Sequence, residues 1–364
     1  MKIIAYIIIL IILYNPAYSI VVFNNDDVEI GVGADLDLAF SYDDISFMPI
    51  EELYLYKSSV LLNFTHKVTS HSSISANFDL WVDETGISTR QWYIMLAAQW
   101  RSQPVIELKI GQVEDFMSNY MTDKIDIINT DEDILKHKDI FGRQISFLGV
   151  DYLYYFSKFI KIHYNYMLEQ DVVESNNMIP VLNNHLQLES DNIYHIKKGY
   201  SIMPTFFIND IYSLSLGYSK IRLDIEPVTA SLNSLSSPLG DNVKLKPTVQ
   251  RNTIRRYIVT SSVKVSGFEG MINYFNVKNT LYNLYNRYEE YDYYLGYNLF
   301  KSPFTIYYWK STYIDHIAHT NAKEVSDTRV YGIKLQANNY SKVSAEFVDT
   351  GSHHTFYTRI HLTI

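Results

Sequence analysis

The sequence has no cysteine, so its fold cannot rest on disulfide bonds. Basic residues do not dominate: 31 Lys and Arg stand against 40 Asp and Glu, and the net charge of −9 argues against nucleic acid as a partner. After residue 19 no apolar run reaches the roughly 20 residues of a membrane-spanning helix. The chain is therefore either an exported soluble protein or a membrane protein of the only other kind, a closed β-barrel.

The first nineteen residues have the pattern of a secretory signal peptide. Lys2 supplies a positive charge ahead of an apolar run, and the small residues Ala17 and Ser19 occupy the −3 and −1 positions of a cleavage site. A retained anchor helix is the alternative, but the apolar run is too short to cross a bilayer. We expect cleavage after Ser19, with 1–19 as the signal peptide and 20–364 as a single barrel domain.

Apolar and polar residues alternate from Asp27 to the end of the chain. In segment 27–42 the alternation continues for far longer than the five or six residues of a typical strand. Segment 88–101 carries Trp92 and Trp100 on its apolar face, about 19 Å apart along a tilted barrel axis. That is close to the spacing of the two interfacial girdles of a membrane barrel, and we expect both tryptophans to face lipid. A soluble lipocalin-like barrel would instead turn its apolar face inward.

We predict an all-β fold, a closed antiparallel transmembrane β-barrel of about 16 strands. Every second junction is very short, as at Ser266, whereas those between are mostly long, such as 114–142 and 226–250. Bacterial barrels show this asymmetry, with short periplasmic turns and long external loops. In the ninth strand the apolar residues change face near Lys220, from which we expect a bulge or an early strand end. The predicted strands are 27–42, 53–67, 72–83, 88–101, 104–113, 143–156, 158–168, 193–208, 211–225, 251–265, 267–278, 289–300, 304–313, 328–338, 342–349 and 354–364.

The connection 114–142 is long and rich in carboxylates, and connections of this length are often functional. Folded inside a barrel, its carboxylates would face cations on the wall and set the ion selectivity of a narrowed channel. Outside the barrel it would be an ordinary solvated acidic loop. Strand parity turns the candidate wall lysines inward, and the central carboxylates of the connection are the best placed to meet them. These candidate constriction residues are Lys57, Lys109, Asp123, Asp126 and Asp131.

Two short patterns flank this acidic connection. Residues 109–112 precede it as Lys-Ile-Gly-Gln, and Arg143, Phe147 and Gly149 follow it in an Arg-x-x-x-Phe-x-Gly pattern; the last strand alternates up to Ile364. The order of elements and these patterns resemble the Gram-negative general diffusion porins, which usually end in Phe. The resemblance implies a homotrimer, an inward Arg143 in a basic cluster that faces the third loop, and a C-terminal strand read by the outer-membrane assembly machinery.

Signals for other chemistry are weak. His316 and His319 have ligand-like spacing without a nearby third ligand, so we expect no metal site. Three arginines cluster where a strand begins and form either an anion-attracting mouth or a solvated strand end; they are Arg251, Arg255 and Arg256. No catalytic motif is found, and we expect neither an enzyme nor a cofactor.

We therefore expect a porin of the bacterial outer membrane, surrounded by lipid, whose water-filled channel passes small hydrophilic solutes and ions by diffusion. The alternative is a barrel that serves mainly as a surface-displayed adhesin or antigen, with a narrow or plugged lumen.

Overall fold

A computed structural model describes most of the chain beyond the expected signal peptide. Residues 1–19 lie outside the described residues, as do Lys57, Arg143 and most of the connection 114–142. Within the described residues, no helix is long and apolar enough to cross a membrane. The described residues are 20–25, 27–43, 53–55, 58–83, 86–100, 103–117, 146–174, 192–225, 250–279, 286–299, 303–316, 323–336, 341–351 and 354–363.

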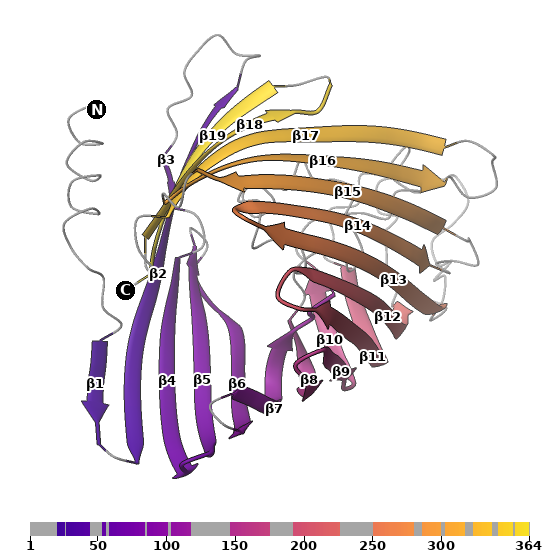
Figure 1. Cartoon of the computed structure of the whole chain (residues 1–364). Helices are drawn as coiled ribbons and strands as arrows, with labels where there is room; N and C mark the ends of the chain where they lie inside the picture. Colours follow the sequence, from indigo (N-terminus) through magenta and orange to yellow (C-terminus); the bar gives the residue numbers. More distant parts are fainter. Residues whose placement is uncertain are drawn as a thin grey trace.

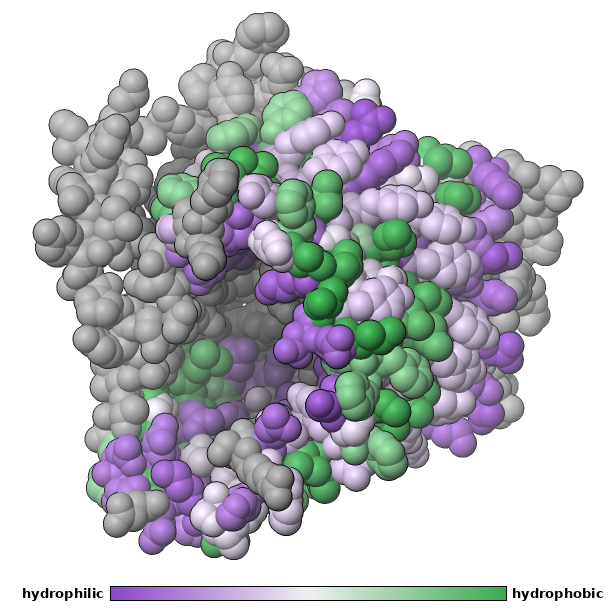
Figure 2. All heavy atoms as spheres, in the orientation of Figure 1, coloured by the Kyte–Doolittle hydropathy of each residue, from purple (hydrophilic) through white to green (hydrophobic). Residues whose placement is uncertain are grey.

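All of the regular structure in these residues is β-strand, and the strands belong to one sheet. Figure 1 shows this sheet curving round on itself, and the space-filling view of Figure 2 shows a hollow on its inner side. The strands of the first half of the chain are β1 (Ile20–Asn24), β2 (Val28–Asp43), β3 (Leu53–Leu55), β4 (Ser58–Thr69), β5 (Ser72–Asp83), β6 (Gly86–Trp100), β7 (Gln103–Glu114), β8 (Ser146–Ser157), β9 (Ile160–Met167) and β10 (Gln170–Glu174).

The second half of the chain continues the same up-and-down order. Its strands are long, and most of them join their neighbours over their full length. They are β11 (Asn192–Ile208), β12 (Tyr212–Ile225), β13 (Gln250–Val265), β14 (Phe268–Asn279), β15 (Asn286–Asn298), β16 (Phe304–His316), β17 (Lys323–Gln336), β18 (Ser341–Asp349) and β19 (His354–Thr363).

The pairing between strands is antiparallel throughout the described sheet. Neighbours in sequence pair from β4 to β9 and from β11 to β19. At the two irregular places, β3 and β4 both pair with β2, and β9 and β10 both pair with β11. The last strand, β19, pairs back with β2, and Figure 1 shows the two strands lying together.

Each strand range predicted from the sequence overlaps an observed strand. The range 72–83 agrees with β5 at both ends, and 342–349 and 354–364 each differ from β18 and β19 by one residue. The predicted strand 53–67 corresponds to β3 and β4, and 158–168 corresponds to β9 with β10 after it. The alternating pattern did not predict β1, which pairs with the start of β2.

The short junctions between strands are tight turns. Between β13 and β14 the chain reverses at Ser266 and Gly267, whose φ angles are 47° and 87°. Positive φ at both central residues is the geometry of a type I′ turn, which fits the twist of an antiparallel hairpin. The turn between β11 and β12 uses Asn209, with φ 51°. These turns lie at one end of the sheet, and the strand ends that border longer connections, such as Ile225 and Gln250, lie at the other.

The two faces of the sheet differ in kind. Large apolar side chains are exposed on the outer face; Trp92 is 41% and Trp100 67% exposed, so neither packs in an interior core. Figure 2 shows this outer wall covered mainly by hydrophobic and intermediate residues, with hydrophilic residues along its right-hand margin. The opposite face carries the buried residues and borders the hollow that is visible beside this wall. An apolar outside around a partly polar inside is the arrangement of a membrane barrel.

Candidate functional site

The tip of the hairpin formed by β7 and β8 leaves the wall, because β7 pairs with β6 only up to Gln112 and β8 pairs with β9 only from Gly149. Gly111 and Gly149 lie opposite each other in this hairpin, and both are buried. Gly111 has a φ of 144°, and a Cβ there would lie 2.3 Å from the carbonyl oxygen of Trp92. A Cβ at Gly149 would lie 2.1 Å from the carbonyl oxygen of Tyr166. Only glycine permits this backbone approach, and Figure 1 shows β7 bending sharply.

Beyond the bend, Asp115 forms an ion pair with Arg256 of β13, and both side chains are fully buried. The sheet order β8, β9, β11 and β12 separates β7 from β13, so this contact reaches across the hollow rather than along the wall. Arg256 Nη2 also donates a hydrogen bond to Ser219 Oγ at 2.8 Å. The first residue after β7 is thereby fixed to the far inner wall.

Phe116 makes a second contact between this segment and the wall. Its ring stacks on His163 of β9, with 4.0 Å between the ring centroids. His163 Nε2 lies 2.6 Å from Asp151 Oδ1, and Lys109 Nζ lies 3.6 Å from Asp151 Oδ2. The Asp151 carboxylate therefore links Lys109 and His163 at the base of the hairpin.

Met117 supplies the third contact, and it is apolar. A Cβ at Gly217 would lie 2.8 Å from Met117 Sδ and 2.2 Å from Ile258 Cγ2, so the missing side chain at Gly217 leaves the space that Met117 occupies. Burial of these apolar side chains holds the hairpin against the inner wall. The buried cluster consists of Val113, Met117, Phe147, Met167, Ile196, Met203, Ile221, Leu223, Ile254, Ile258, Phe275 and Val277.

Closer to the short turns, the inner wall is polar. Thr205 and Ser215 share a hydrogen bond of 2.9 Å, and Thr260 donates to Asn273 at 2.9 Å; Asn273 in turn donates to Asp292 Oδ2 at 3.0 Å. Cross-strand pairing places these groups directly beside one another, so they form a polar ladder across neighbouring strands. Its residues are Thr205, Ser215, Thr260, Asn273, Asp292 and Ser311.

Of the residues predicted for a constriction, the structure describes only Lys109. Its side chain is 30% exposed and faces Asp151 on the neighbouring strand. Lys57, Arg143 and the three central aspartates of the connection 114–142 lie outside the described residues. Their roles stay predictions, whereas the start of that connection, 115–117, lies against the inner wall.

Sequence reasoning missed the pairing of Asp115 with Arg256. We treated Arg255 and Arg256 as one cluster, although alternation assigns consecutive residues to opposite faces. In the structure Arg256 is buried inside and Arg255 is exposed on the outer face, so these two arginines do not share one surface. Strand parity could have separated the two residues, but nothing local identifies Asp115 as the partner.

Comparisons with known proteins identify the fold. No family model and no curated protein matches the sequence. Among solved structures, the chain is similar to OmpT, an outer membrane protein of Vibrio cholerae in its trimer form, with TM-score 0.64 and 11% identity over 93% of this chain and 100% of that one. It is also similar to the outer membrane channel DcaP of Acinetobacter baumannii, with TM-score 0.60 and 10% identity over 94% and 99% of the two chains.

A third similar structure is OmpF of Salmonella typhi in complex with daunomycin, with TM-score 0.61 and 7% identity over 94% and 99% of the two chains. Identities this low concern the fold alone, and the fold is that of the outer-membrane β-barrels. The neighbours agree with the bacterial outer membrane as the expected location.

Proposed function

We propose that the chain forms a closed barrel of sixteen strands in the outer membrane and acts as a porin for passive diffusion of small hydrophilic solutes and ions. The return of β19 to β2 supports closure, if β3 with β4 and β9 with β10 each count as one interrupted strand and β1 lies outside the ring. Sixteen-stranded barrels leave an aqueous channel that needs no catalytic group or cofactor. The trimer form of one similar structure supports a homotrimer here.

The observation that carries the proposal is the position of the β7–β8 hairpin. Asp115, Phe116 and Met117 each contact a different strand of the inner wall. A connection that starts inside the barrel narrows the lumen instead of covering its mouth. Because the wall beside it carries Lys109, Asp151 and the polar ladder, the path that is left is lined with groups that water and polar solutes can contact.

A second function is favoured by a different feature of the same wall. The apolar cluster around Met117 and Ile258 is buried, and such packing suits a filled lumen better than a wet one. A barrel filled in this way would serve display, as an adhesin or surface antigen. The two functions differ in whether solute crosses the barrel.

Liposome swelling separates them. Vesicles that contain the refolded protein are diluted into isotonic solutions of sugars of increasing size, and swelling is followed by light scattering. A porin gives fast swelling with monosaccharides and progressively slower swelling with larger sugars. Vesicles with the protein correctly inserted that swell no faster than protein-free vesicles, whatever the sugar, would rule out the porin and leave display.

A further inference from the structure

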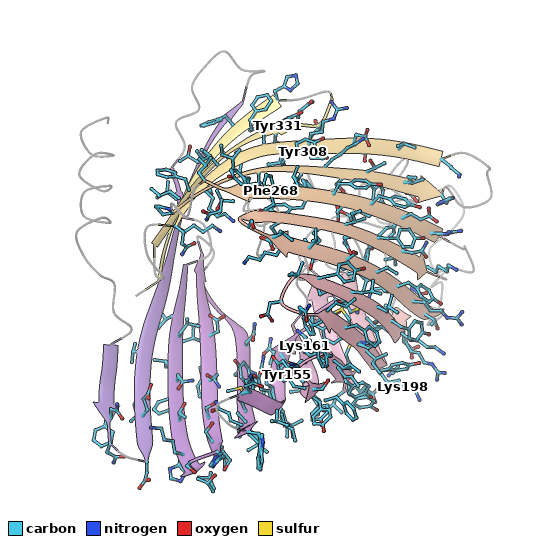
Figure 3. The ribbon with its side chains drawn as sticks, in the orientation of Figure 1. Tyr155, Lys161, Lys198, Phe268, Tyr308 and Tyr331 are labelled. Atoms are coloured by element: carbon cyan, nitrogen blue, oxygen red, sulfur yellow. The ribbon has the colours of Figure 1, made fainter. Side chains whose placement is uncertain are left out.

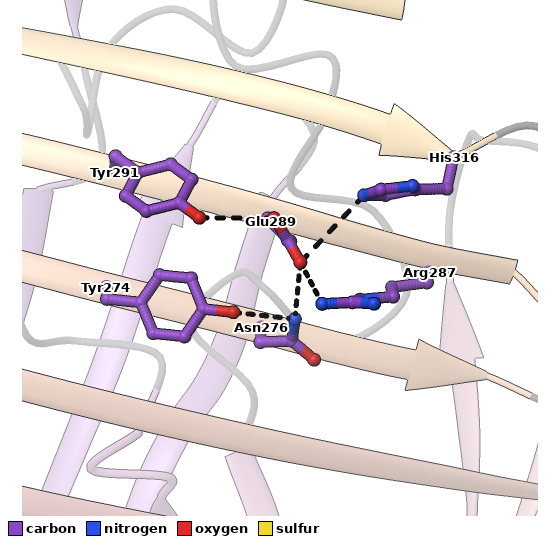
Figure 4. Close-up of polar contacts among 6 residues, drawn as sticks. All are labelled: Tyr274, Asn276, Arg287, Glu289, Tyr291 and His316. Atoms are coloured by element: carbon purple, nitrogen blue, oxygen red, sulfur yellow. Dashed lines mark hydrogen bonds and ion pairs between the residues drawn. The ribbon is translucent and has the colours of Figure 1, made fainter. Parts of the chain in front are cut away.

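Aromatic rings form a belt on the outer wall, on the side of the long connections. The ring centroids of Tyr200 and Tyr218 are 6.0 Å apart, and those of Tyr218 and Tyr257 are 5.2 Å apart. The belt continues with Tyr274 of β14 and Tyr291 of β15, whose ring centroids are 5.0 Å apart and which Figure 4 shows on adjacent strands. Aromatic girdles of membrane barrels lie at the membrane interface, so this belt marks the interface on the side of the long connections.

Cations follow directly beyond the belt. On each of β11, β12 and β13, a cation lies two positions nearer to the long connection than the tyrosine does, and therefore on the same face. The pairs of cation and tyrosine are Lys198 with Tyr200, Lys220 with Tyr218, and Arg255 with Tyr257. Figure 3 shows Lys198 at the right-hand margin of the sheet, away from Phe268 at the turn end of β14. Long connections of bacterial barrels are external, so these cations lie at the headgroup level of the outer leaflet.

Two of these cations, Lys220 and Arg255, lie side by side with a further one, Lys278, on adjacent strands. Lys220 is directly opposite Arg255, and Arg255 is directly opposite Lys278 of β14. Like charges in such positions repel one another and destabilise a sheet. No carboxylate among the described residues forms an ion pair with any of the three; Lys278 instead lies over the ring of Tyr257, with Nζ 5.5 Å from the centroid.

On β16 and β17, facing cations do have carboxylate partners. Lys310 and Arg329 are also directly opposite each other, but Asp327 lies 3.2 Å from Lys310 and Asp349 lies 3.5 Å from Arg329. The protein therefore supplies its own counter-charges on β16, β17 and β18.

The row of cations without an ion pair ends at Lys278, because Arg287, the next cation on β15, forms an ion pair with Glu289. Figure 4 shows Glu289 between Arg287 and His316, with hydrogen bonds from Asn276 Nδ2 at 3.2 Å and from the Tyr291 hydroxyl at 3.2 Å. Within the part of the chain that the structure describes, no ion pair compensates Lys220, Arg255 and Lys278, nor the adjoining Lys198 and Arg222, which are directly opposite each other on β11 and β12.

We propose that Lys220, Arg255 and Lys278 bind the phosphate groups of a lipid in the outer leaflet. The occupant is a phosphorylated lipid because the three cations lie just outside the aromatic belt, where a headgroup lies and where its acyl chains reach the exposed apolar wall below. Residues such as Leu216, Val259 and Ile272 offer that wall on the same strands. The site rests on the membrane placement in the proposed function and is independent of solute passage.

Lipid A, a glycolipid with two phosphates, is the probe for the test. It is titrated into the full-length protein refolded in neutral detergent micelles, and the melting temperature is followed. A lipid that binds only the folded barrel raises the melting temperature. We expect the lipid concentration at half-maximal rise to increase about a hundredfold in Lys220→Gln/Arg255→Gln/Lys278→Gln, since each cation near an anionic lipid contributes about fivefold. If the triple variant does not refold, Arg255→Gln alone takes its place; we expect it to increase the half-maximal lipid concentration about fivefold.

The matched control is Lys310→Gln/Arg329→Gln, whose cations are already neutralised and should leave the half-maximal concentration unchanged. Inorganic phosphate at the same concentrations should not raise the melting temperature, because it offers no acyl chains. Equal titrations for the wild type and the triple variant, or an equal effect of dephosphorylated lipid A, would overturn the site. Loss of lipid binding with normal liposome swelling separates this proposal from the porin proposal, and normal lipid binding without swelling would reject only the porin.

Discussion

Replacing Arg256 by Met should strongly destabilise the barrel. Arg256 and Asp115 are both fully buried, so Arg256→Met leaves the carboxylate of Asp115 in the interior without its cation. Removal of one partner from a buried pair costs about 3–5 kcal/mol. The double replacement Arg256→Met/Asp115→Leu should recover most of this loss, because apolar residues of similar volume can replace a whole buried pair at little cost.

The free energy of unfolding is measured by urea titration of the refolded protein in vesicles, with the slope of the transition compared between variants. The double variant closes a double-mutant cycle that isolates the coupling between the two side chains. A loss below about 1 kcal/mol in Arg256→Met is typical of an exposed pair. That result, or a double variant as unstable as the single one, would refute the buried tether between hairpin and wall.

Gly217→Val should cost about 1–3 kcal/mol of unfolding free energy by overpacking against Met117 and Ile258, whereas Gly31→Ala should have little effect, because its Cβ would have only Asn63 Cβ, at 4.0 Å, as a neighbour. On β14, lysine at Ile272 should cost about 2–4 kcal/mol and lysine at Phe268, near the turn end, about 0–1 kcal/mol; equal losses would contradict the assigned membrane depth. Arg143→Gln should make the channel more cation-selective in reversal-potential measurements across a salt gradient, and unchanged potentials would remove Arg143 from the constriction. The opposite shift is expected from neutralising the central carboxylates, which are Asp123, Asp126 and Asp131.

The strands could be predicted because each one separates two different environments. A residue on a barrel strand faces either the membrane side or the interior, and this forces the alternation that the sequence shows. Turn chemistry helped as well, since Ser266 and Gly267 mark the reversal between β13 and β14. The segment Ile20–Asn24 lacks this alternation, which is why β1 was not predicted.

The interior could not be predicted from alternation, as the ninth predicted strand shows. Its apolar residues change face near Lys220, and the bulge or early end that we expected is wrong: β12 pairs with β13 without interruption from Tyr212 to Ile225. Ile221 and Leu223 face inward because they pack in the cluster that receives the β7–β8 hairpin. Such a contact joins residues far apart in the sequence, and no local pattern reports it.

Single-channel recording tests the central claim most directly. The refolded wild-type protein is added to a planar lipid bilayer under voltage, in salt solutions of increasing concentration. A porin with a water-filled lumen gives discrete conductance steps that grow with salt concentration, and Arg256→Met gives noisier steps because its hairpin is no longer held to the wall. Protein that inserts into the bilayer, as judged by protease protection, without any conductance step would contradict the account.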